Sequence, residues 1–120
     1  MRVFKNTWFT RFAAREAISD DELKGIVNQL EAGQAGVGLG GGVYKVRISR
    51  PGAGKSGGYR VIVFFRRGER IFYVYGFAKS DMGNISDKQL KDFKTTAKIT
   101  LAYTDEQLDK LVKTNWFVEI

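Results

Sequence analysis

Basic side chains are the groups of this sequence that are best suited to chemistry. The chain contains no histidine and no cysteine, so it lacks an imidazole that titrates near neutral pH, a thiolate nucleophile and any cysteine metal site. A metal site made only of carboxylates would need clustered Asp and Glu, and no such cluster stands out in the sequence. Proton transfer and charge stabilisation must therefore come from Lys, Arg, Tyr, Asp or Glu.

The basic residues are concentrated in one segment. Residues 43–79 hold nine of the 20 basic residues and one of the 13 acidic residues, so this segment carries the whole excess behind the net charge of +7. Its basic residues are Lys45, Arg47, Arg50, Lys55, Arg60, Arg66, Arg67, Arg70 and Lys79. Such a concentration indicates a polyanionic partner, either a nucleic acid or an acidic protein. The alternative is a solvated basic face without a partner.

Within this segment, the stretch RPGAGKSGG over residues 50–58 suggests a nucleotide-binding loop. A P-loop has the pattern G-x-x-x-x-G-K-[ST] and lies between a strand and a helix. Gly54-Lys55-Ser56 matches the end of that pattern, but Ser49 stands where the first glycine is needed. A strand rather than a helix is expected to follow, so no helix N-terminus would face a phosphate. We therefore predict a basic hairpin loop and no nucleotide cofactor.

Strands predicted on both sides of this loop would hold the basic residues. In VYKVRIS, residues 43–49, Tyr44, Val46 and Ile48 alternate with Lys45 and Arg47, so the two sets face opposite ways. Residues 59–65 and 70–78 are rich in aromatic and β-branched residues, and a turn around Gly68 joins them. Residues 43–78 thus predict an antiparallel meander. The glycine-rich segment 33–42 before it is predicted to be a flexible connector without helix or strand.

Helices are predicted before and after the meander. The N-terminal part predicts a strand over residues 2–5, a helix around Trp8 and Phe12, and a helix that starts at a Ser19–Glu22 capping box and ends near Gly33. Further capping boxes at Ser86–Gln89 and Thr104–Gln107 predict two C-terminal helices.

This order indicates the α+β class: a small antiparallel sheet of three to four strands with helices packed on one face. Tyr44, Val46 and Ile48 would lie under the helices, and the basic set would line the open face. A length of 120 residues fits one domain over residues 1–120. No apolar run is long enough to span a membrane, and the N-terminus does not read as a signal peptide, so we expect a cytoplasmic protein.

The central part of the sequence resembles a known family. GGGVYKVRISRPGAGKSGGYRVIVFF and ERIFYVYGFAKSDMGNISDKQLKDFK contain, in order, a K-x-R strand, an R-x-G-x-G-K-x-G-G-x-R loop, an aromatic strand that ends in lysine, and a helix opened by an Ile-Ser cap. Over residues 40–95 this set resembles the RelE/ParE superfamily of bacterial type II toxins, and it is most similar to the HigB-like branch.

The resemblance implies the RelE-like toxin fold and a metal-independent endoribonuclease that needs no cofactor. Such a toxin cleaves messenger RNA in the ribosomal A site, inhibits translation, and is neutralised by a cognate helix-turn-helix antitoxin encoded beside it. Relatives of the ParE type instead inhibit DNA gyrase and lack the RNase residues. A non-catalytic ParE-like inhibitor and a basic nucleic-acid-binding module without toxicity are the alternative functions.

Cleavage of RNA by its 2′-hydroxyl needs a base, stabilisation of a more negative transition state and a proton for the leaving oxygen. Arg effectively never deprotonates, whereas a Lys whose pKa is lowered by neighbouring cations can act as the base. By match to the family pattern, we expect Lys55 and Lys79 to transfer protons and Arg47 and Arg60 to hold the phosphate. The expected RNA-binding residues beside them are Lys45, Arg50 and Arg66.

Each candidate also has an ordinary structural interpretation. Lys45, Arg47 and Arg60 could be solvated residues on an exposed sheet face, and Lys79 could simply end its strand. Tyr73 and Tyr75 are interpreted as core or sheet-face residues rather than base-stacking groups. Tyr103, in the staple before a helix, is expected to be buried. Trp116 and Phe117 are expected to pack the C-terminus onto the core, although an exposed pair would mark a partner site.

Overall fold

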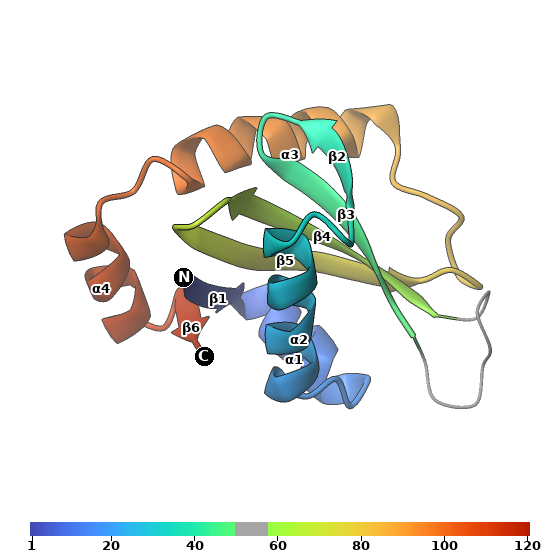
Figure 1. The fold of residues 1–120 in the computed structure, drawn as a ribbon, viewed down its shortest axis with the longest axis horizontal. Coiled ribbons are helices and arrows are strands. Elements are labelled where there is room, and N and C mark those ends of the chain that lie inside the picture. The colour runs from blue at the N-terminus through green and yellow to red at the C-terminus, as the bar shows by residue number, and fades with distance from the viewer. Residues whose placement is uncertain (50–57) are drawn as a thin grey trace.

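Helices precede and follow a group of strands along the chain, as predicted for the α+β class. In the computed structural model, the described residues are 1–49 and 58–120. Within them lie, in order, β1 (Arg2–Asn6), α1 (Thr7–Arg15), α2 (Asp20–Glu31), β2 (Val37–Gly40), β3 (Val43–Ile48), β4 (Tyr59–Arg66), β5 (Arg70–Ala78), α3 (Asp87–Thr100), α4 (Asp105–Lys113) and β6 (Phe117–Glu119) (Figure 1). Among the helices of these residues, none has the length and apolar character needed to cross a membrane.

The predicted meander forms the centre of the sheet. β3, β4 and β5 pair antiparallel in sequence order, with Arg47 opposite Arg60 and Arg60 opposite Phe77. The turn between β4 and β5 contains Gly68, whose φ of 75° lies in the left-handed region that glycine adopts without strain. The prediction of an antiparallel meander over residues 43–78 is therefore confirmed where the structure describes the chain.

The sheet is wider than predicted, and it is not wholly antiparallel. Its strand order is β2-β3-β4-β5-β1-β6, with β1 parallel to β5 and β6 antiparallel to β1. β2 lies in the segment predicted to be a flexible connector, so that prediction is wrong over Val37–Gly40. β2 is an edge strand that pairs only with β3, and Gly38 leaves room for the ring of Tyr44 across the pair. A short edge strand of this kind tolerates glycines that a central strand would not.

α1 and α2 cover one face of the sheet. The four apolar residues predicted for α2, Leu23, Ile26, Val27 and Leu30, are all buried there. They belong to one core cluster with Val46 and Ile48 of β3, and Tyr44 packs against that cluster. The predicted facing of β3 is therefore confirmed, and Lys45 and Arg47 are left on the opposite face.

α3 and α4 lie on this opposite face, so the prediction that helices cover only one face is wrong. Ala97 of α3, Leu108 of α4 and the adjoining Leu101 are buried in a second cluster with Ile62 and Phe64 of β4. The physical reason is visible in β4 itself, where five consecutive residues, Val61–Phe65, are buried. A strand that is apolar on both faces needs cover on both faces.

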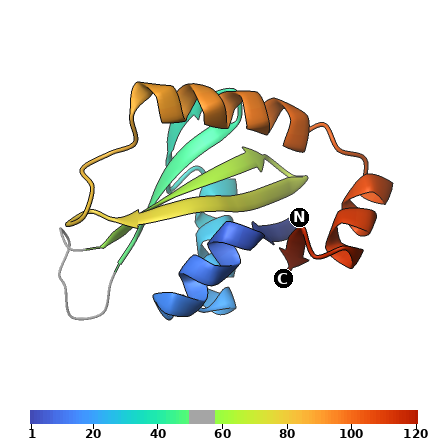
Figure 2. The ribbon, with the colours of Figure 1, turned by 180° about the vertical axis from the view of Figure 1, so that it is seen from behind.

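The cover on the second face is incomplete. α3 follows the β2–β3 side of the sheet, where Lys94 lies next to Gly40 and Gly41. Figure 2 shows β5 between α3 on one side and α1 on the other, with α4 near one end. The apolar residues of β4 and β5 on this face, such as Ile62, Phe64 and Phe72, are buried, whereas Arg47 near the end of β3 is exposed.

The helix ends agree with the sequence. The capping boxes at Ser19–Glu22, Ser86–Gln89 and Thr104–Gln107 are all formed, with the cap side chain accepting from the third backbone amide and the Glu or Gln accepting from the cap amide. Each box satisfies two backbone donors that a helix leaves unpaired at its start. Because these caps fix where α2, α3 and α4 begin, they also fix where each helix meets the sheet.

A cluster of charges holds α4 and β6 against β1. The guanidinium of Arg2 lies 2.9 Å from the carboxylate of Glu119, 2.8 Å from that of Asp109 and 3.2 Å from that of Asp105. The hydrogen bonds to these carboxylates, chiefly that to Glu119, raise the pKa of Arg2 above its ordinary value. Phe117 packs on Phe4 and Phe72 beside this cluster, as expected for the C-terminus.

Candidate nucleic-acid interface

Two arginines lie opposite each other on neighbouring strands near one end of the sheet. Arg47 of β3 and Arg60 of β4 are directly opposite each other in the strand register, on the face that α1 and α2 do not cover. Arg47 is exposed and Arg60 is half-buried. Like charges in this position repel one another across a strand pair, whereas an anion that bridges them is attracted by both. This row is therefore suited to a phosphate group.

Lys45 and Lys79 extend the basic surface around this row. Lys45 precedes Arg47 by two residues on the same face of β3, and its ammonium lies 3.4 Å from the side-chain oxygen of Asn84 in the connection from β5 to α3. Lys79 follows the last residue of β5 and is exposed, and its backbone amide donates to the carbonyl of Gly58 at 3.1 Å. The structure thus brings Lys45, Arg47, Arg60 and Lys79 to one end of the sheet. We call these four residues the basic end.

The remaining predicted residues of the loop, Arg50 and Lys55, lie outside the described residues, as does Gly54-Lys55-Ser56. What the structure does describe is the element that follows: β4 begins at Tyr59, and no helix begins there. The expected strand after the Gly-Lys-Ser stretch is confirmed, and with it the main structural argument against a P-loop.

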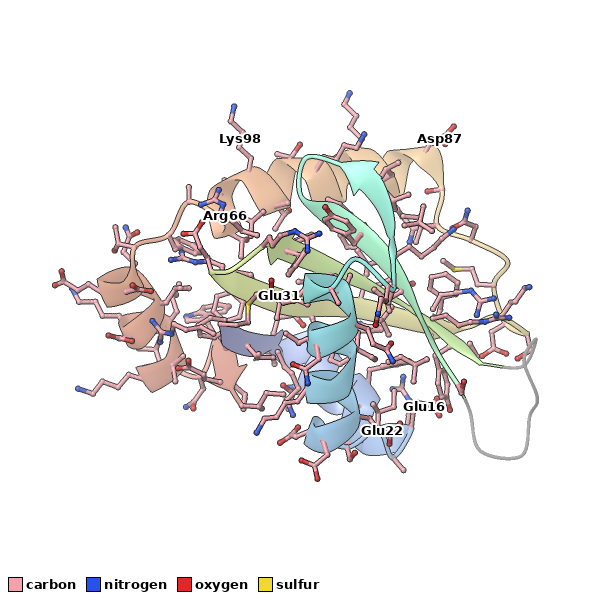
Figure 3. The ribbon with its side chains drawn as sticks, viewed as in Figure 1. Glu16, Glu22, Glu31, Arg66, Asp87 and Lys98 are labelled. Carbon is pink, nitrogen blue, oxygen red and sulfur yellow. The ribbon has the colours of Figure 1, made fainter. Side chains whose placement is uncertain are left out.

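Arg66 is not part of the basic end, although it was predicted to bind RNA with the others. It lies six residues along β4 from Arg60, at the β4–β5 hairpin, where it is 3.8 Å from the carboxylate of Glu69. Figure 3 shows Arg66 at the hairpin end of the sheet, opposite the end where β3 stops and β4 starts. Sequence reasoning could not separate these arginines, because they share one strand and one face.

The two neighbouring arginines at the hairpin end have structural partners. Arg67 donates to the backbone carbonyls of Leu30 and Glu31 at the end of α2. Arg70 is 9% exposed and donates to the carbonyl of Tyr103 and to Asp105, which ties β5 to the start of α4. The described part of the positive segment therefore divides into the basic end and a hairpin end, where Arg67 and Arg70 bond to the ends of helices.

An aromatic groove continues the same face away from the basic end. It has a volume of about 550 Å³ and is lined by six aromatic residues, with Asn, Thr, Val and Leu side chains between them. The aromatic residues are Trp8 of α1, Phe64 of β4, Phe93 of α3, Tyr103 between α3 and α4, Trp116 between α4 and β6, and Phe117 of β6. Among residues 1–49 and 58–120, no charged side chain belongs to this lining. Sequence reasoning missed the groove, because nothing in the sequence shows that α1 and α3 frame the same face.

Tyr75 connects the basic end to the aromatic groove. Its ring centroid lies 6.1 Å from that of Phe77, which is paired with Arg60, and 4.6 Å and 5.7 Å from those of Trp8 and Phe93. Tyr75 is half-buried on this face, whereas Tyr73 is fully buried on the other side and donates to the carbonyl of Leu23 at 2.7 Å. Burial raises the pKa of Tyr73 above its ordinary value. The interpretation of Tyr73 as a core residue is confirmed.

Two further expectations need correction at the groove. Trp116 is 65% exposed, so of the pair Trp116 and Phe117 only Phe117 packs on the core as expected. Tyr103 is half-buried rather than buried, and its ring lines the groove. Both differences have one cause, since α4 and β6 close the end of the groove and do not fill it.

The model of one protein family matches the whole chain, residues 1–120. This family is described as the RelE toxin of the RelE / RelB toxin-antitoxin system. No curated protein matches the chain. The family match includes the basic end, the aromatic groove and the helices that frame them.

Proposed function

We propose that this chain, which belongs to the RelE toxin family, cleaves messenger RNA in the A site of the ribosome and so inhibits translation. Membership of the family confirms the resemblance to the RelE/ParE superfamily and indicates a toxin of a toxin–antitoxin system. We place the chain in the HigB-like branch of the superfamily, on the pattern of residues 40–95. The observation that carries the RNase proposal is the paired row of Arg47 and Arg60, with Lys45 and Lys79 beside it.

The cleavage that we propose is a transfer within the RNA. The 2′-oxygen of one ribose attacks the adjacent phosphorus, the bond from phosphorus to the 5′-oxygen breaks, and the products end in a 2′,3′-cyclic phosphate and a 5′-hydroxyl. Arg47 and Arg60 hold the non-bridging oxygens and stabilise the additional negative charge that these oxygens carry in the transition state. One lysine accepts the proton of the 2′-hydroxyl, and a second proton donor protonates the leaving 5′-oxygen.

Lys79 and Lys55 are our candidates for the two proton transfers. The backbone amide of Lys79 donates to the carbonyl of Gly58 just before β4, and Gly58 follows Lys55 by three residues in the sequence. Gly58 cannot carry a side chain there, because a Cβ would lie 2.3 Å from the carbonyl oxygen of Ile48. The end of β3, the start of β4 and the end of β5 are thereby held together around Arg47 and Arg60, which we call the phosphate row.

The partner of the toxin follows from the family. The RelE / RelB description names a toxin with an antitoxin, and we propose a helix-turn-helix antitoxin encoded by an adjacent gene, acting with the toxin in the cytoplasm. Neutralisation by such a protein would keep the basic end away from ribosome-bound RNA until the antitoxin is removed.

Induced expression followed by mapping of RNA 5′ ends tests the proposal. Wild-type protein should stop growth and produce new 5′ ends at a fixed phase within codons, and the double variant Arg47→Ala/Arg60→Ala should do neither. Lys98→Ala, which removes an exposed cation from α3, is the matched control and should remain toxic. Growth arrest without new 5′ ends would contradict the RNase proposal and favour inhibition of DNA gyrase. Normal growth at high expression of the wild type would contradict both toxin functions.

A further inference from the structure

The aromatic groove has no role in the proposed cleavage, yet it lies on the face that carries the basic end. Its two tryptophans are exposed to an unusual degree for such large side chains, Trp8 by 42% and Trp116 by 65%. Exposed aromatic residues gathered on one surface indicate a binding site. The chemistry of the lining decides what kind of group it would take.

The lining favours an uncharged, flat group that is held by ring contacts. Half of the lining residues are aromatic, and none is charged. Several polar groups of the lining already have partners: Asn6 donates to Val74 and accepts from Phe9, and the hydroxyls of Thr96 and Thr100 donate to carbonyls of their own helix. A ligand would therefore gain little from these groups and much from stacking. Nucleobases are uncharged aromatic planes, and proteins bind single-stranded RNA by stacking bases on aromatic side chains.

The position of the groove points in the same direction. Arg60, Ile62 and Phe64 follow one another on this face of β4, so the phosphate row and the floor of the groove are about 13 Å apart along the strand. On β5, Phe77 is paired with Arg60, and its ring contacts that of Tyr75. The ring of Tyr75 in turn contacts Trp8 and Phe93. Leu111 of α4 and Phe117 of β6 close the far end of the groove. An RNA strand whose phosphate lies on Arg47 and Arg60 can continue along this face.

We infer that the aromatic groove binds a nucleobase of the substrate RNA that lies beyond the nucleotides flanking the cleaved phosphate, and that Trp8 and Trp116 stack on it. The inference rests on the proposed function for its ligand, since it takes the phosphate row as the place where the RNA backbone lies. Stacking contacts tolerate different bases, so the groove contributes affinity and a preference by ring size rather than a strict sequence requirement.

Tryptophan fluorescence tests this inference directly, because Trp8 and Trp116 are the only two tryptophans of the chain. The probes are adenosine, cytidine, inorganic phosphate, and a short oligonucleotide that is 2′-O-methylated throughout and cannot be cleaved. Both nucleosides and the oligonucleotide should quench the fluorescence in a saturable way, and phosphate should not. The double variant Arg47→Ala/Arg60→Ala should still respond to the nucleosides but bind the oligonucleotide more weakly.

Variants of the groove give the second measurement. Trp116→Ala should weaken oligonucleotide binding by about 5- to 150-fold, measured by fluorescence anisotropy of a labelled oligonucleotide. Trp8→Phe keeps a ring on Phe12 and should weaken it less, so a loss of fold at this position does not confuse the result. Val37→Ala, an exposed apolar residue on β2 away from the groove, is the matched control and should bind as the wild type does.

Two results would overturn the inference. One is unchanged tryptophan fluorescence with every nucleoside and with the oligonucleotide. The other is oligonucleotide binding that neither Trp116→Ala nor Trp8→Phe weakens. These outcomes are independent of the proposed function. If the toxin cleaves ribosome-bound messenger RNA but its fluorescence does not change, only base binding in the groove is refuted. If it binds nucleosides but does not cleave RNA, only the RNase activity is refuted.

Discussion

Arg60 and Arg66 offer a comparison within one strand that tests where the chemistry takes place. Both are arginines on the same face of β4, six residues apart, and a strand rises about 3.4 Å per residue, so they are roughly 20 Å apart. Arg60→Ala removes a cation from the phosphate row, and Arg66→Ala removes one from the hairpin end. The two variants change the net charge of the protein equally, so any difference between them reflects position.

The expected magnitudes differ widely. A cation about 4 Å from a phosphate contributes about 4 kcal/mol at an effective dielectric constant of 20. Loss of one group that stabilises transition-state charge costs about 100- to 1000-fold in kcat. A cation roughly 20 Å away contributes about 0.2 kcal/mol in water, and salt screens this further because the Debye length is about 8 Å. From these magnitudes, Arg60→Ala should lower the cleavage rate by about two to three orders of magnitude, and Arg66→Ala should lower it by less than about twofold.

The assay is single-turnover cleavage of messenger RNA bound to purified ribosomes, with toxin in excess. Circular dichroism melts of both variants establish that each is folded at the assay temperature. Equal losses of rate in the two variants would refute the reasoning, because a charge at the hairpin end would then act as strongly as one in the phosphate row. A large loss in Arg66→Ala alone would confirm Arg66 as an RNA-binding residue and place the site farther along β4.

The fold makes two further predictions. Tyr73→Phe removes a buried hydrogen bond and should lower the free energy of unfolding by about 1 kcal/mol at neutral pH. Burial raises the pKa of Tyr73, so the contribution of its hydroxyl to stability is complete below about pH 10 and is lost as the pH rises further. Above that pH, the free energy of urea unfolding of the wild type should fall by about 1.4 kcal/mol per pH unit relative to that of the variant. A difference that stays constant with pH would contradict this. Gly76→Ala would place a Cβ 2.5 Å from the buried ring of Phe12, and it should cost about 1–3 kcal/mol. Gly25→Ala, with nothing within 4 Å on the exposed side of α2, should instead stabilise by about 0.5–1 kcal/mol, and the opposite order of the two alanine variants would refute the packing described.

Local patterns of this sequence predicted local structure well. The three capping boxes, the apolar stripe of α2 and the alternation in β3 each depend on residues within a few positions of one another, and each is found as predicted. The meander could be predicted for the same reason, since a turn around Gly68 joins neighbouring strands. These features fix which face of β3 carries Lys45 and Arg47.

Long-range arrangement was the part that the sequence did not reveal. β1 pairs parallel to β5 across more than sixty residues of chain, and no local signal specifies that partner. The burial of both faces of β4 was readable in its apolar run, yet which helices cover the second face depends on the path of α3 and α4. For the same reason Arg66 could not be separated from Arg60, and the aromatic groove, which unites residues from seven elements, had no sequence signature.

The proposed RNase activity is tested most directly by chemistry on one ribose. Ribosomes are programmed with a messenger RNA of defined A-site codon, and the nucleotide before the cleaved phosphate is supplied either as ribose or as 2′-deoxyribose. We predict that the wild-type toxin cleaves the ribose form to a 2′,3′-cyclic phosphate and a 5′-hydroxyl, and leaves the 2′-deoxy form intact. Cleavage of both forms at the same rate, or no cleavage of either, would contradict attack by the 2′-hydroxyl on a phosphate held by Arg47 and Arg60.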